Sequence, residues 1–451
     1  MTPGHGAEHL MRMGMDPLDA MSRASLMEGV ERACCAAMPG PPEWRAFVPG
    51  RIEVFGKHTD YAGGRALLTA VPRGFAVAAR ARQDSCVRVV DARYGQIVEV
   101  DVAAEGARPK GFGAYVDVVA RRLALNFPGA SLGVDTVLAS DLPRAAGVSS
   151  SSALVVGIAW AIIRRGRLQD RPEWRAHIGS LQDLAWYLGC VENGLDYPGL
   201  TGSSGVGTLG GSEDHTAILT CRAGFLSQYR FVPVTHLGDT PMPGHWTFVV
   251  ASSGVQADKA GSVRDRYNRA SLGTRALLDL WNARAAAPSP SLGAALSSEV
   301  GAMGQLEAWV SESGAAGFSP ADLRDRLHHF AREDGRADRA AAAFAGADRD
   351  ALRTLAAESQ HEADHLLGNQ VPETRSLVAA AVEAGAVGAS SFGAGFGGSA
   401  WALVDALTAE RFADEWIRAY RTREPTITDV EWFVARPGPA LTELSETAFS
   451  V

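Results

Sequence analysis

The sequence predicts a two-domain α/β protein. At 451 residues, the chain is longer than a single hydrophobic core usually serves. In both halves of the chain, strand-like alternation of apolar and polar residues is interleaved with helix-like periodicity. A stretch rich in Gly, Pro and polar residues, at 236–246, separates the two halves. We therefore predict one domain over residues 1–240 and a second over residues 241–451.

The first half is expected to begin its ordered elements near Trp44. Short runs bounded by turn residues predict strands, and longer apolar runs predict helices. These are strands near 76–81, 86–93 and 133–143, a helix from Ser151, and a helix over about 173–193. The segment 215–234 has the pattern of a β-hairpin, with its turn at 222–224.

The second half is expected to open with a strand at 247–253. A region dominated by Ala, Leu, Arg and Glu follows, from Ala270 to Leu367, and predicts a set of helices. The remaining elements are strands near 387–392, 399–405 and 429–435, and helices over 373–384 and 408–421.

Composition narrows the class of protein. The formal net charge of −8 argues against a nucleic-acid partner, since such proteins favour strongly basic surfaces. Five cysteines, without any C-x-x-C spacing, fit a reducing cytoplasm. The N-terminus has no continuous apolar segment, and the longest apolar run, 153–163, is far shorter than the roughly 20 residues of a membrane span. We expect a cytoplasmic protein, monomer or dimer, with no membrane partner.

The segment "LPRAAGVSSSSALVV" at 142–156 carries a strong functional signal. Pro143 and Gly147 shape a turn after a strand, and four serines, Ser149 to Ser152, lead directly into an apolar helix. A helix N-terminus exposes unpaired N–H groups and a partial positive charge, and serine hydroxyls add donors to phosphate or ligands to Mg²⁺. One serine would indicate a helix cap, whereas four in a row favour a phosphate site. The Walker A pattern is absent.

A second small-residue segment, "GASSFGAGFGGSAWALV" at 388–404, formally contains G-x-G-x-x-G. A dinucleotide site requires a helix directly after these glycines. Here the following residues, Ser399 to Val404, alternate as a strand would. We interpret the segment as a Gly-rich turn between strands that lets the backbone approach a ligand closely.

The third segment is "PGRIEVFGKHTDYAGG", at 49–64, whose charge density is unlike that of a core strand. With this segment the three loops resemble, in order, the motifs of the GHMP kinases, and H-T-D-Y-x-G-G resembles the galactokinase branch. The resemblance spans about residues 45–435 and leaves residues 1–44 outside. It implies a ribosomal-S5-like N-terminal α/β domain with a left-handed crossover, a ferredoxin-like C-terminal domain, and an active site between them.

The resemblance also implies a reaction, transfer of the γ-phosphoryl group of ATP to the anomeric hydroxyl of a galactose-like sugar. Asp214 matches the residue that activates the sugar hydroxyl, and Arg51 matches its partner. Ser151 and Glu192 match ligands of Mg²⁺. The nucleotide-binding positions by resemblance are Pro143, Gly147, Ser149, Ser150, Ser151 and Ser152. The sugar-contacting positions are Lys57, His58, Asp60 and Gly211, together with Arg264 or, with a shifted alignment, Tyr267.

Departures from the family pattern bear on the substrate. Ser152 stands where the family has Ala, His215 where it often has Gln, and a Gly/Ser-rich insertion at 195–210 lengthens the path between Glu192 and Asp214. Lys57 replaces a Glu that accepts a hydrogen bond from the sugar, and lysine has donors only. Either Lys57 faces the sugar and reads an anionic group, such as a carboxylate, or it points outward or pairs with Glu53 or Asp60.

Two alternatives to a neutral-sugar kinase therefore stay open from the sequence. A uronate kinase would pair the carboxylate of its substrate with Lys57 and Arg264. A sugar sensor that has lost catalysis would bind without turnover, although the retained Arg51, Glu192 and Asp214 favour an enzyme.

Overall fold

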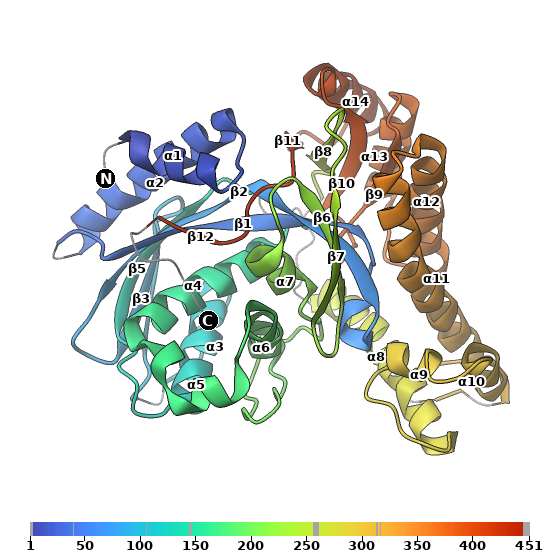
Figure 1. The fold of residues 1–451 in the computed structure, drawn as a ribbon, viewed down its shortest axis with the longest axis horizontal. Helices are drawn as coiled ribbons and strands as arrows, with labels where there is room; N and C mark the ends of the chain where they lie inside the picture. Colours follow the sequence, from blue (N-terminus) through green and yellow to red (C-terminus); the bar gives the residue numbers. More distant parts are fainter. Residues whose placement is uncertain are drawn as a thin grey trace.

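The structure is built around two β-sheets that lie side by side, with helices on their outer faces (Figure 1). This computed structural model describes residues 3–38, 40–104, 106–143, 147–255, 261–312, 314–315 and 317–444. The first sheet is formed mainly by residues before Trp246 and the second by residues after it. The predicted boundary at 240/241 falls at the end of the strand that precedes Trp246.

The first sheet has the strand order β12-β1-β2-β5-β3-β4, and β6 and β7 extend it from the end of β2. All pairs are antiparallel except β3 with β5. Its strands are β1 (Trp44–Phe55), β2 (Arg65–Ala81), β3 (Cys86–Asp91), β4 (Gln96–Asp101), β5 (Val134–Ser140), β6 (Phe225–Arg230), β7 (Thr235–Pro241) and β12 (Thr442–Glu443). The last of these belongs to the end of the chain, so the C-terminal segment returns to the first sheet.

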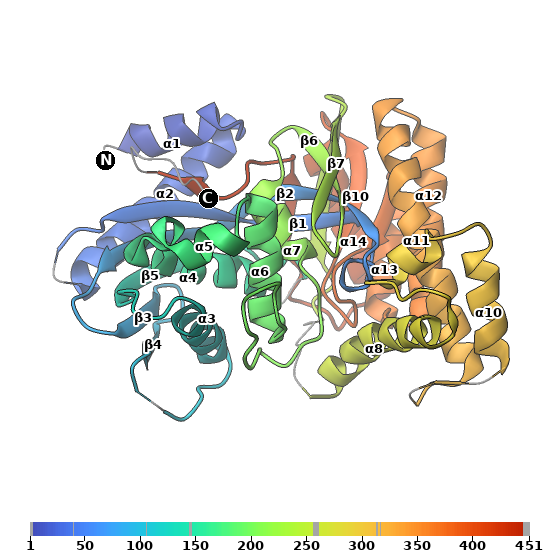
Figure 2. The same ribbon diagram turned by 60° about the horizontal axis from the view of Figure 1, so that its bottom comes forward.

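One face of this sheet is covered by a helical layer that carries much of the site (Figure 2). Its helices are α3 (Phe112–Asn126), α4 (Ser150–Gly166), η2 (Leu168–Asp170), α5 (Pro172–His177), α6 (Leu181–Asn193) and α7 (Glu213–Thr220). The apolar run 153–163 forms the centre of α4 and is buried throughout. Helix α4 contacts β1 and β2 as well as α3, α6 and α7. A helix surrounded on all sides has no polar face, which explains its uninterrupted apolar sequence.

The opposite face of the first sheet is covered by α1 (Pro3–Arg12) and α2 (Pro17–Ala37) (Figure 1). Met27 and Val30 of α2 pack against Phe47 and Ala76 of the sheet. Arg23 adds a buried ion pair with Asp141 at 2.7 Å. The N-terminal segment, which lies outside the family resemblance, therefore closes an apolar sheet face that would otherwise meet water.

The second sheet has the order β11-β8-β10-β9 and is antiparallel throughout. Its strands are β8 (Trp246–Ser252), β9 (Gly388–Ser391), β10 (Ser399–Asp405) and β11 (Trp432–Ala435). Helices α13 (Pro372–Glu383) and α14 (Ala409–Arg423) bury Leu377 and Trp416 against one face. The strands and helices predicted for this part of the chain agree with those observed.

A helical arm extends from the second sheet and reaches back to the first (Figure 1). It consists of α8 (Gly261–Arg284), α9 (Leu292–Leu296), α10 (Ala302–Glu312), α11 (Pro320–Ala345), α12 (Arg349–Glu362) and the π-helical turn η3 (Ala363–Leu367). Helix α11 contacts β1, β2 and β7, and α12 contacts β9. The short helix η1 (Asp60–Ala62), in the loop after β1, packs against α8. The two sheets are thus joined by these helices as well as by the chain.

Four sequence predictions of local structure are wrong. The charge density of the segment 49–64 is not typical of a core strand, yet its residues up to Phe55 belong to strand β1 and are buried. The segment 215–220 belongs to helix α7 and not to a hairpin strand. The prediction failed because the segment is buried on nearly all sides and its sequence therefore shows no helical periodicity. The residues expected to form a loop at 236–241 belong to strand β7, an exposed edge strand whose polar side chains show no apolar alternation. The helix predicted over 173–193 is two helices, with a break at Ile178 to Ser180.

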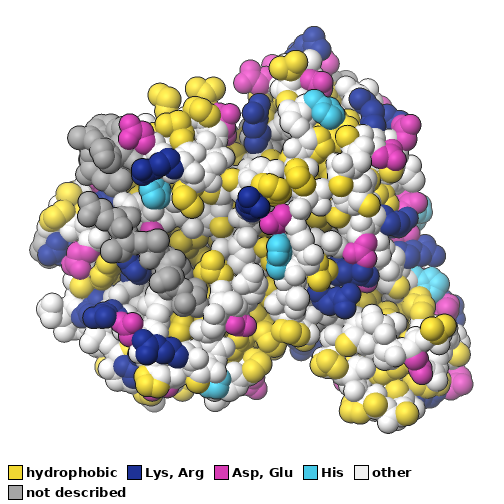
Figure 3. All heavy atoms as spheres, viewed as in Figure 1, with side chains coloured by type: hydrophobic (Ala, Val, Ile, Leu, Met, Phe, Trp, Pro, Cys, Tyr) yellow, Lys and Arg dark blue, Asp and Glu magenta, His cyan; other side chains and the backbone are white. Residues whose placement is uncertain are grey.

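The surface fits the modest net charge. On the face shown in Figure 3, acidic and basic side chains are interspersed over both parts of the molecule and are not segregated by sign. Among the described helices, none combines the length and apolar character that a bilayer crossing requires.

The docking of α2 on the sheet yields a stability prediction. Met27 is 5% exposed, whereas Met21 on the same helix is 61% exposed. Met27→Ala should lower the free energy of unfolding by about 2–5 kcal/mol, since it leaves a cavity under the helix. Met21→Ala, the matched control, should change it by less than about 0.5 kcal/mol. Urea unfolding monitored by circular dichroism measures both values, and equal effects of the two substitutions would contradict the packing role of α2.

Candidate active site

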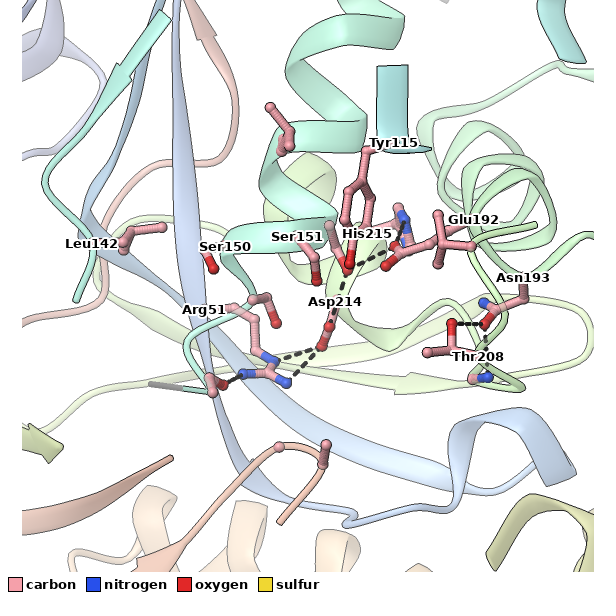
Figure 4. A pocket seen from close by; sticks show the side chains of 18 of the residues that line it. Arg51, Tyr115, Leu142, Ser150, Ser151, Glu192, Asn193, Thr208, Asp214 and His215 are labelled. Atoms are coloured by element: carbon pink, nitrogen blue, oxygen red, sulfur yellow. Dashed lines mark hydrogen bonds and ion pairs between the residues drawn. The ribbon is translucent and has the colours of Figure 1, made fainter. Parts of the chain in front are cut away.

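The three small-residue loops meet at one cavity of about 540 Å³ between the two sheets and the helical arm. Residues from β1, from the N-terminus of α4, from the end of α6, from the start of α7 and from α8 line it. Gly393 and Ala394, from the turn between β9 and β10, complete the wall. Segments far apart in the sequence therefore build a single site, part of which is shown in Figure 4.

The centre of the cavity is an ion pair between Arg51 and Asp214 (Figure 4). Two guanidinium nitrogens of Arg51, Nε and Nη2, lie 2.8 and 2.7 Å from Asp214 Oδ1. The third nitrogen donates to the carbonyl of Gly147 at 2.6 Å, which ties the arginine to the phosphate loop. The Arg51 side chain is 4% exposed and that of Asp214 is 21% exposed. Burial opposes the charge of Arg51, but the carboxylates of Asp214, Glu213 and Glu53 outweigh it and raise the arginine's pKa.

Asp214 is also linked to Glu192 through a serine hydroxyl. Ser152 Oγ lies 2.9 Å from Glu192 Oε2 and 3.2 Å from Asp214 Oδ2. His215 Nε2 lies 3.0 Å from the same oxygen of Glu192. Ser152, in the first turn of α4, is therefore the serine that contacts Glu192 directly, while the expected role of Ser151 and Glu192 as Mg²⁺ ligands stays a prediction. Ser151 lines the cavity one residue earlier.

The start of α4 has the features of an anion site. Gly147 and Ser149 to Ser152 line the cavity, and Ser149, which precedes the helix, has a positive φ of 61°. The first turn of α4 therefore borders the cavity, and the partial positive charge of a helix N-terminus favours phosphate. Of the other predicted nucleotide contacts, Pro143 is buried but does not line the cavity, and residues 144–146 lie outside the described residues.

Beyond the serines, the cavity continues into an aromatic region that the sequence analysis did not identify. Phe112 and Tyr115, from the first turn of α3, line the cavity, as do Tyr94 and Leu142. Flat aromatic walls of this kind suit the base of a nucleotide. The sequence signal was slight, since these aromatics are scattered and do not form a motif.

At the other end, His58, Asp60, Gly211, Arg264 and Tyr267 come together, as the resemblance implied. Asp60 Oδ2 accepts the backbone N–H of Glu213 at 3.1 Å. A Cβ on Gly211 would lie 2.3 Å from the same oxygen, so only glycine fits there. The rings of His58 and Tyr267 lie 5.3 Å apart. Arg264 and Tyr267 both reach the cavity, so both alignments considered above lead to this wall.

The prediction that Lys57 contacts the sugar is wrong. Lys57 does not line the cavity; its side chain is fully buried, and Nζ donates to Ser359 and Ser390 at 2.8 and 2.6 Å. Of the alternatives, Lys57 does not point outward and no contact joins it to Asp60 among the described residues, whereas the charge of Glu53 does act on it. The neighbouring residue His58 has a positive φ of 57°, and this turn sends the two side chains in different directions.

Several lining residues were not predicted. Asn193 Oδ1 accepts from Thr208 Oγ1 at 2.9 Å and from the N–H of Gly210 at 2.7 Å, which holds the Gly/Ser-rich insertion at the rim of the cavity (Figure 4). Glu53 and Glu213 are both buried near Arg51. Burial raises the pKa of both carboxyl groups, and the charge of Glu53 raises that of Glu213 further.

Comparison with known proteins agrees with this geometry. The galactokinase galactose-binding signature matches residues 37–81, and the C-terminal domain of the GHMP kinases matches residues 340–422. Among solved structures, that of Lactococcus lactis galactokinase complexed with galactose superposes with a TM-score of 0.71 at 21% identity, covering 92% of this chain and 99% of that one. Methanococcus jannaschii mevalonate kinase superposes with a TM-score of 0.53 at 14% identity, covering 89% and 99%. The fold is that of the GHMP kinases.

Sequence relatives place the chain within that class. A galactokinase from Roseiflexus sp. (strain RS-1) is 30% identical over 377 residues, which cover 82% of this chain and 86% of the relative. A galactokinase from Chloroflexus aggregans is 27% identical over 394 residues, covering 85% and 89%. The chain belongs to the galactokinase family, and the family and fold class predicted from its sequence are confirmed.

The Glu53–Glu213 pair yields a prediction for the pH dependence of stability. Burial raises the pKa of Glu53 from its ordinary value of 4.5 to about 7. Between these values the folded protein retains a proton that the unfolded chain has released, so the free energy of unfolding should fall as the pH rises from about 4.5 to about 7. Glu53→Gln removes this titration and should flatten the decline, as urea titrations between pH 5 and 7 would show.

Glu383→Gln, at an exposed position on α13, is the control and should retain the wild-type dependence on pH. A decline in Glu53→Gln as steep as that of the wild type would contradict the raised pKa of Glu53.

Proposed function

We propose that this protein is an ATP-dependent sugar 1-kinase, which transfers the γ-phosphoryl group of ATP to the anomeric hydroxyl of a galactose-like monosaccharide. The observation that carries the proposal is the Arg51–Asp214 ion pair. It lies between the serine-rich start of α4, which suits a phosphate chain, and the polar wall of His58, Asp60 and Tyr267, which suits a sugar. The galactokinases among its relatives support the same reaction.

In this proposal Asp214 is the base that accepts the proton of the sugar hydroxyl. Its Oδ1 accepts from two nitrogens of Arg51, and its Oδ2 accepts from Ser152 at 3.2 Å, so the carboxylate is held in a fixed position. Arg51, held in turn by Gly147, would stabilise the negative charge that develops on the transferring phosphoryl group.

Mg²⁺ is the expected companion of ATP in this reaction, and the available donors fit it. Ser151, Ser152, Glu192 and Asp214 present only hydroxyl and carboxylate oxygens to this part of the cavity, the ligands that a hard divalent cation prefers. We assign Ser151 and Glu192 as the residues that would hold it. When bound, Mg²⁺ neutralises charge on the phosphates and orients them.

The position of Lys57 bears on the sugar class. The ammonium of Lys57 is buried away from the cavity, so Arg264 alone remains of the two cations that were expected to bind a carboxylate. The Arg264 side chain is 43% exposed and lies 3.8 Å from Asp265. The remaining wall of carboxyl, imidazole and phenol groups suits the hydroxyls of a neutral sugar. We therefore favour a neutral galactose-like substrate over a uronate.

Asp214→Asn tests the catalytic assignment. Because the amide cannot accept the proton, turnover should fall by roughly 10²–10⁴-fold, the usual worth of a general base. Affinity for nucleotide should change much less, since the amide oxygen can still accept from Arg51, whose bond to Gly147 of the phosphate loop is kept. A coupled assay of ADP release with a panel of free sugars, together with calorimetry of ATP binding, measures both quantities. Turnover within a few-fold of the wild type would contradict the role of Asp214.

The nucleotide assignment is tested with Glu192→Gln and Ser151→Ala. Both substitutions remove an oxygen ligand, so each should weaken binding of Mg·ATP by about 10-fold or more, the usual loss at a metal site. Binding of the sugar alone should remain close to that of the wild type. Isothermal titration with Mg·ATP, with ATP in chelator, and with sugar separates these effects. Unchanged Mg·ATP affinity in both variants would contradict the assignment.

A further inference from the structure

We propose that Lys57 is a positioning residue, which fixes the sugar-binding loop by fastening it to helix α12 and strand β9. The sugar-binding loop is defined here as residues 56–64, which carry His58 and Asp60 into the cavity. This role of Lys57 rests on the proposed function, because it assumes that the loop holds the sugar. Lys57 would then contribute to sugar binding although its side chain does not line the cavity.

The contacts of Lys57 reach across the two halves of the molecule. Its Nζ donates to Ser359 Oγ of α12 at 2.8 Å and to Ser390 Oγ of β9 at 2.6 Å. All three side chains are fully buried. A buried ammonium is costly unless its hydrogen bonds are satisfied, so this group has little freedom to move. The loop after β1 is therefore attached to the second half at a fixed point.

Glu333 of α11 also attaches the loop, through a hydrogen bond to the loop backbone. Its Oε1 accepts the N–H of Gly56 at 3.0 Å and the hydroxyl of Ser359 at 3.1 Å. Burial alone would raise the pKa of Glu333, but the positive charges of Arg336 and Lys57 outweigh it and lower that pKa. Arg336 is held by Glu362 of α12 at 2.7 Å. The lysine thus lies in a buried network of alternating charge that spans the loop, α11 and α12.

This attachment bears directly on the sugar-binding residues, because Lys57 immediately precedes His58. The positive φ of His58, 57°, is unfavourable for a residue with a side chain and persists only where its surroundings enforce it. Arg326 holds the carbonyl of His58 at 2.5 Å, and Tyr61 holds its ring at 2.9 Å. With the Lys57 bonds on one side and these on the other, the turn is held from both ends. Release of one end should let His58 and Asp60 leave their positions.

Two variants test the proposal. Lys57→Met keeps the length of the side chain and removes the ammonium. The double variant Ser359→Ala/Ser390→Ala keeps Lys57 and removes both of its acceptors, and it remains informative if Lys57→Met does not fold. Ser227→Ala is the matched control, since this fully buried serine donates to Asp239 in the β6–β7 hairpin, outside the cavity.

The first measurement is amide hydrogen exchange, which does not depend on catalysis. The amide of Gly56 donates to Glu333, and the amides of Thr59 and Gly64 donate to carbonyl groups within the loop. In both test variants, peptides covering 56–64 should exchange at least about 10-fold faster, while peptides covering the start of α4 stay within about 3-fold. Ser227→Ala should leave both regions as in the wild type. Unchanged exchange of 56–64 in the test variants, or equal acceleration in both regions, would overturn the proposal.

The second measurement is steady-state kinetics with varied sugar and varied ATP. Both test variants should raise the KM for the sugar by about 10-fold or more, the scale expected from a displacement of about 1 Å, while the KM for ATP stays within about 3-fold. A rise of both KM values together would indicate general destabilisation and would overturn the positioning role. A wild-type protein that turns over no sugar would count against the proposed function, and the exchange experiment would still decide the role of Lys57.

Discussion

The arrangement of the site depends on the buried ion pair between Arg51 and Asp214. The Arg51 guanidinium is almost fully buried and therefore requires carboxylate partners, of which Asp214 contacts it most closely. The pair also fixes the relation between three segments, because Arg51 belongs to β1, Asp214 to α7, and Gly147, the third partner, to the phosphate loop. Strand, helix and loop must all be in place before the guanidinium is fully bonded.

Charges of alternating sign continue away from that pair into the interior. Near Arg51 lie Glu53 and Glu213, whose pKa values are raised by burial, and beyond them the backbone N–H of Lys57 donates to Glu333. Burial makes each of these groups unfavourable alone, and their mutual attraction makes the set favourable together. The network links the sugar-binding loop with the helical arm, so the two walls of the cavity are held by electrostatic contacts as well as by apolar packing.

The sequence predicted many of the residues that line the cavity. Serines before an apolar run, glycines in a turn, and an arginine and an aspartate in recognisable motifs are local features, and their local chemistry can be read directly. Other lining residues were not predicted, because they belong to no recognisable local motif. They are Phe112, Tyr115, Asn193 and Glu53. An aromatic or polar residue on a helix or strand looks ordinary in sequence, and it becomes a lining residue only when the fold turns it toward the cavity.

Tertiary structure alone decided where the side chains of adjacent residues point. His58 and Lys57 are neighbours in one motif, but a positive φ sends the first toward the cavity and the second into the interior. It likewise brought Ser152 into contact with Glu192, and it made 215–220 a helix despite its strand-like pattern. The reason is physical: residue type and spacing specify which interactions are available, whereas direction and burial depend on contacts with segments hundreds of residues away, such as Ser359 and Ser390.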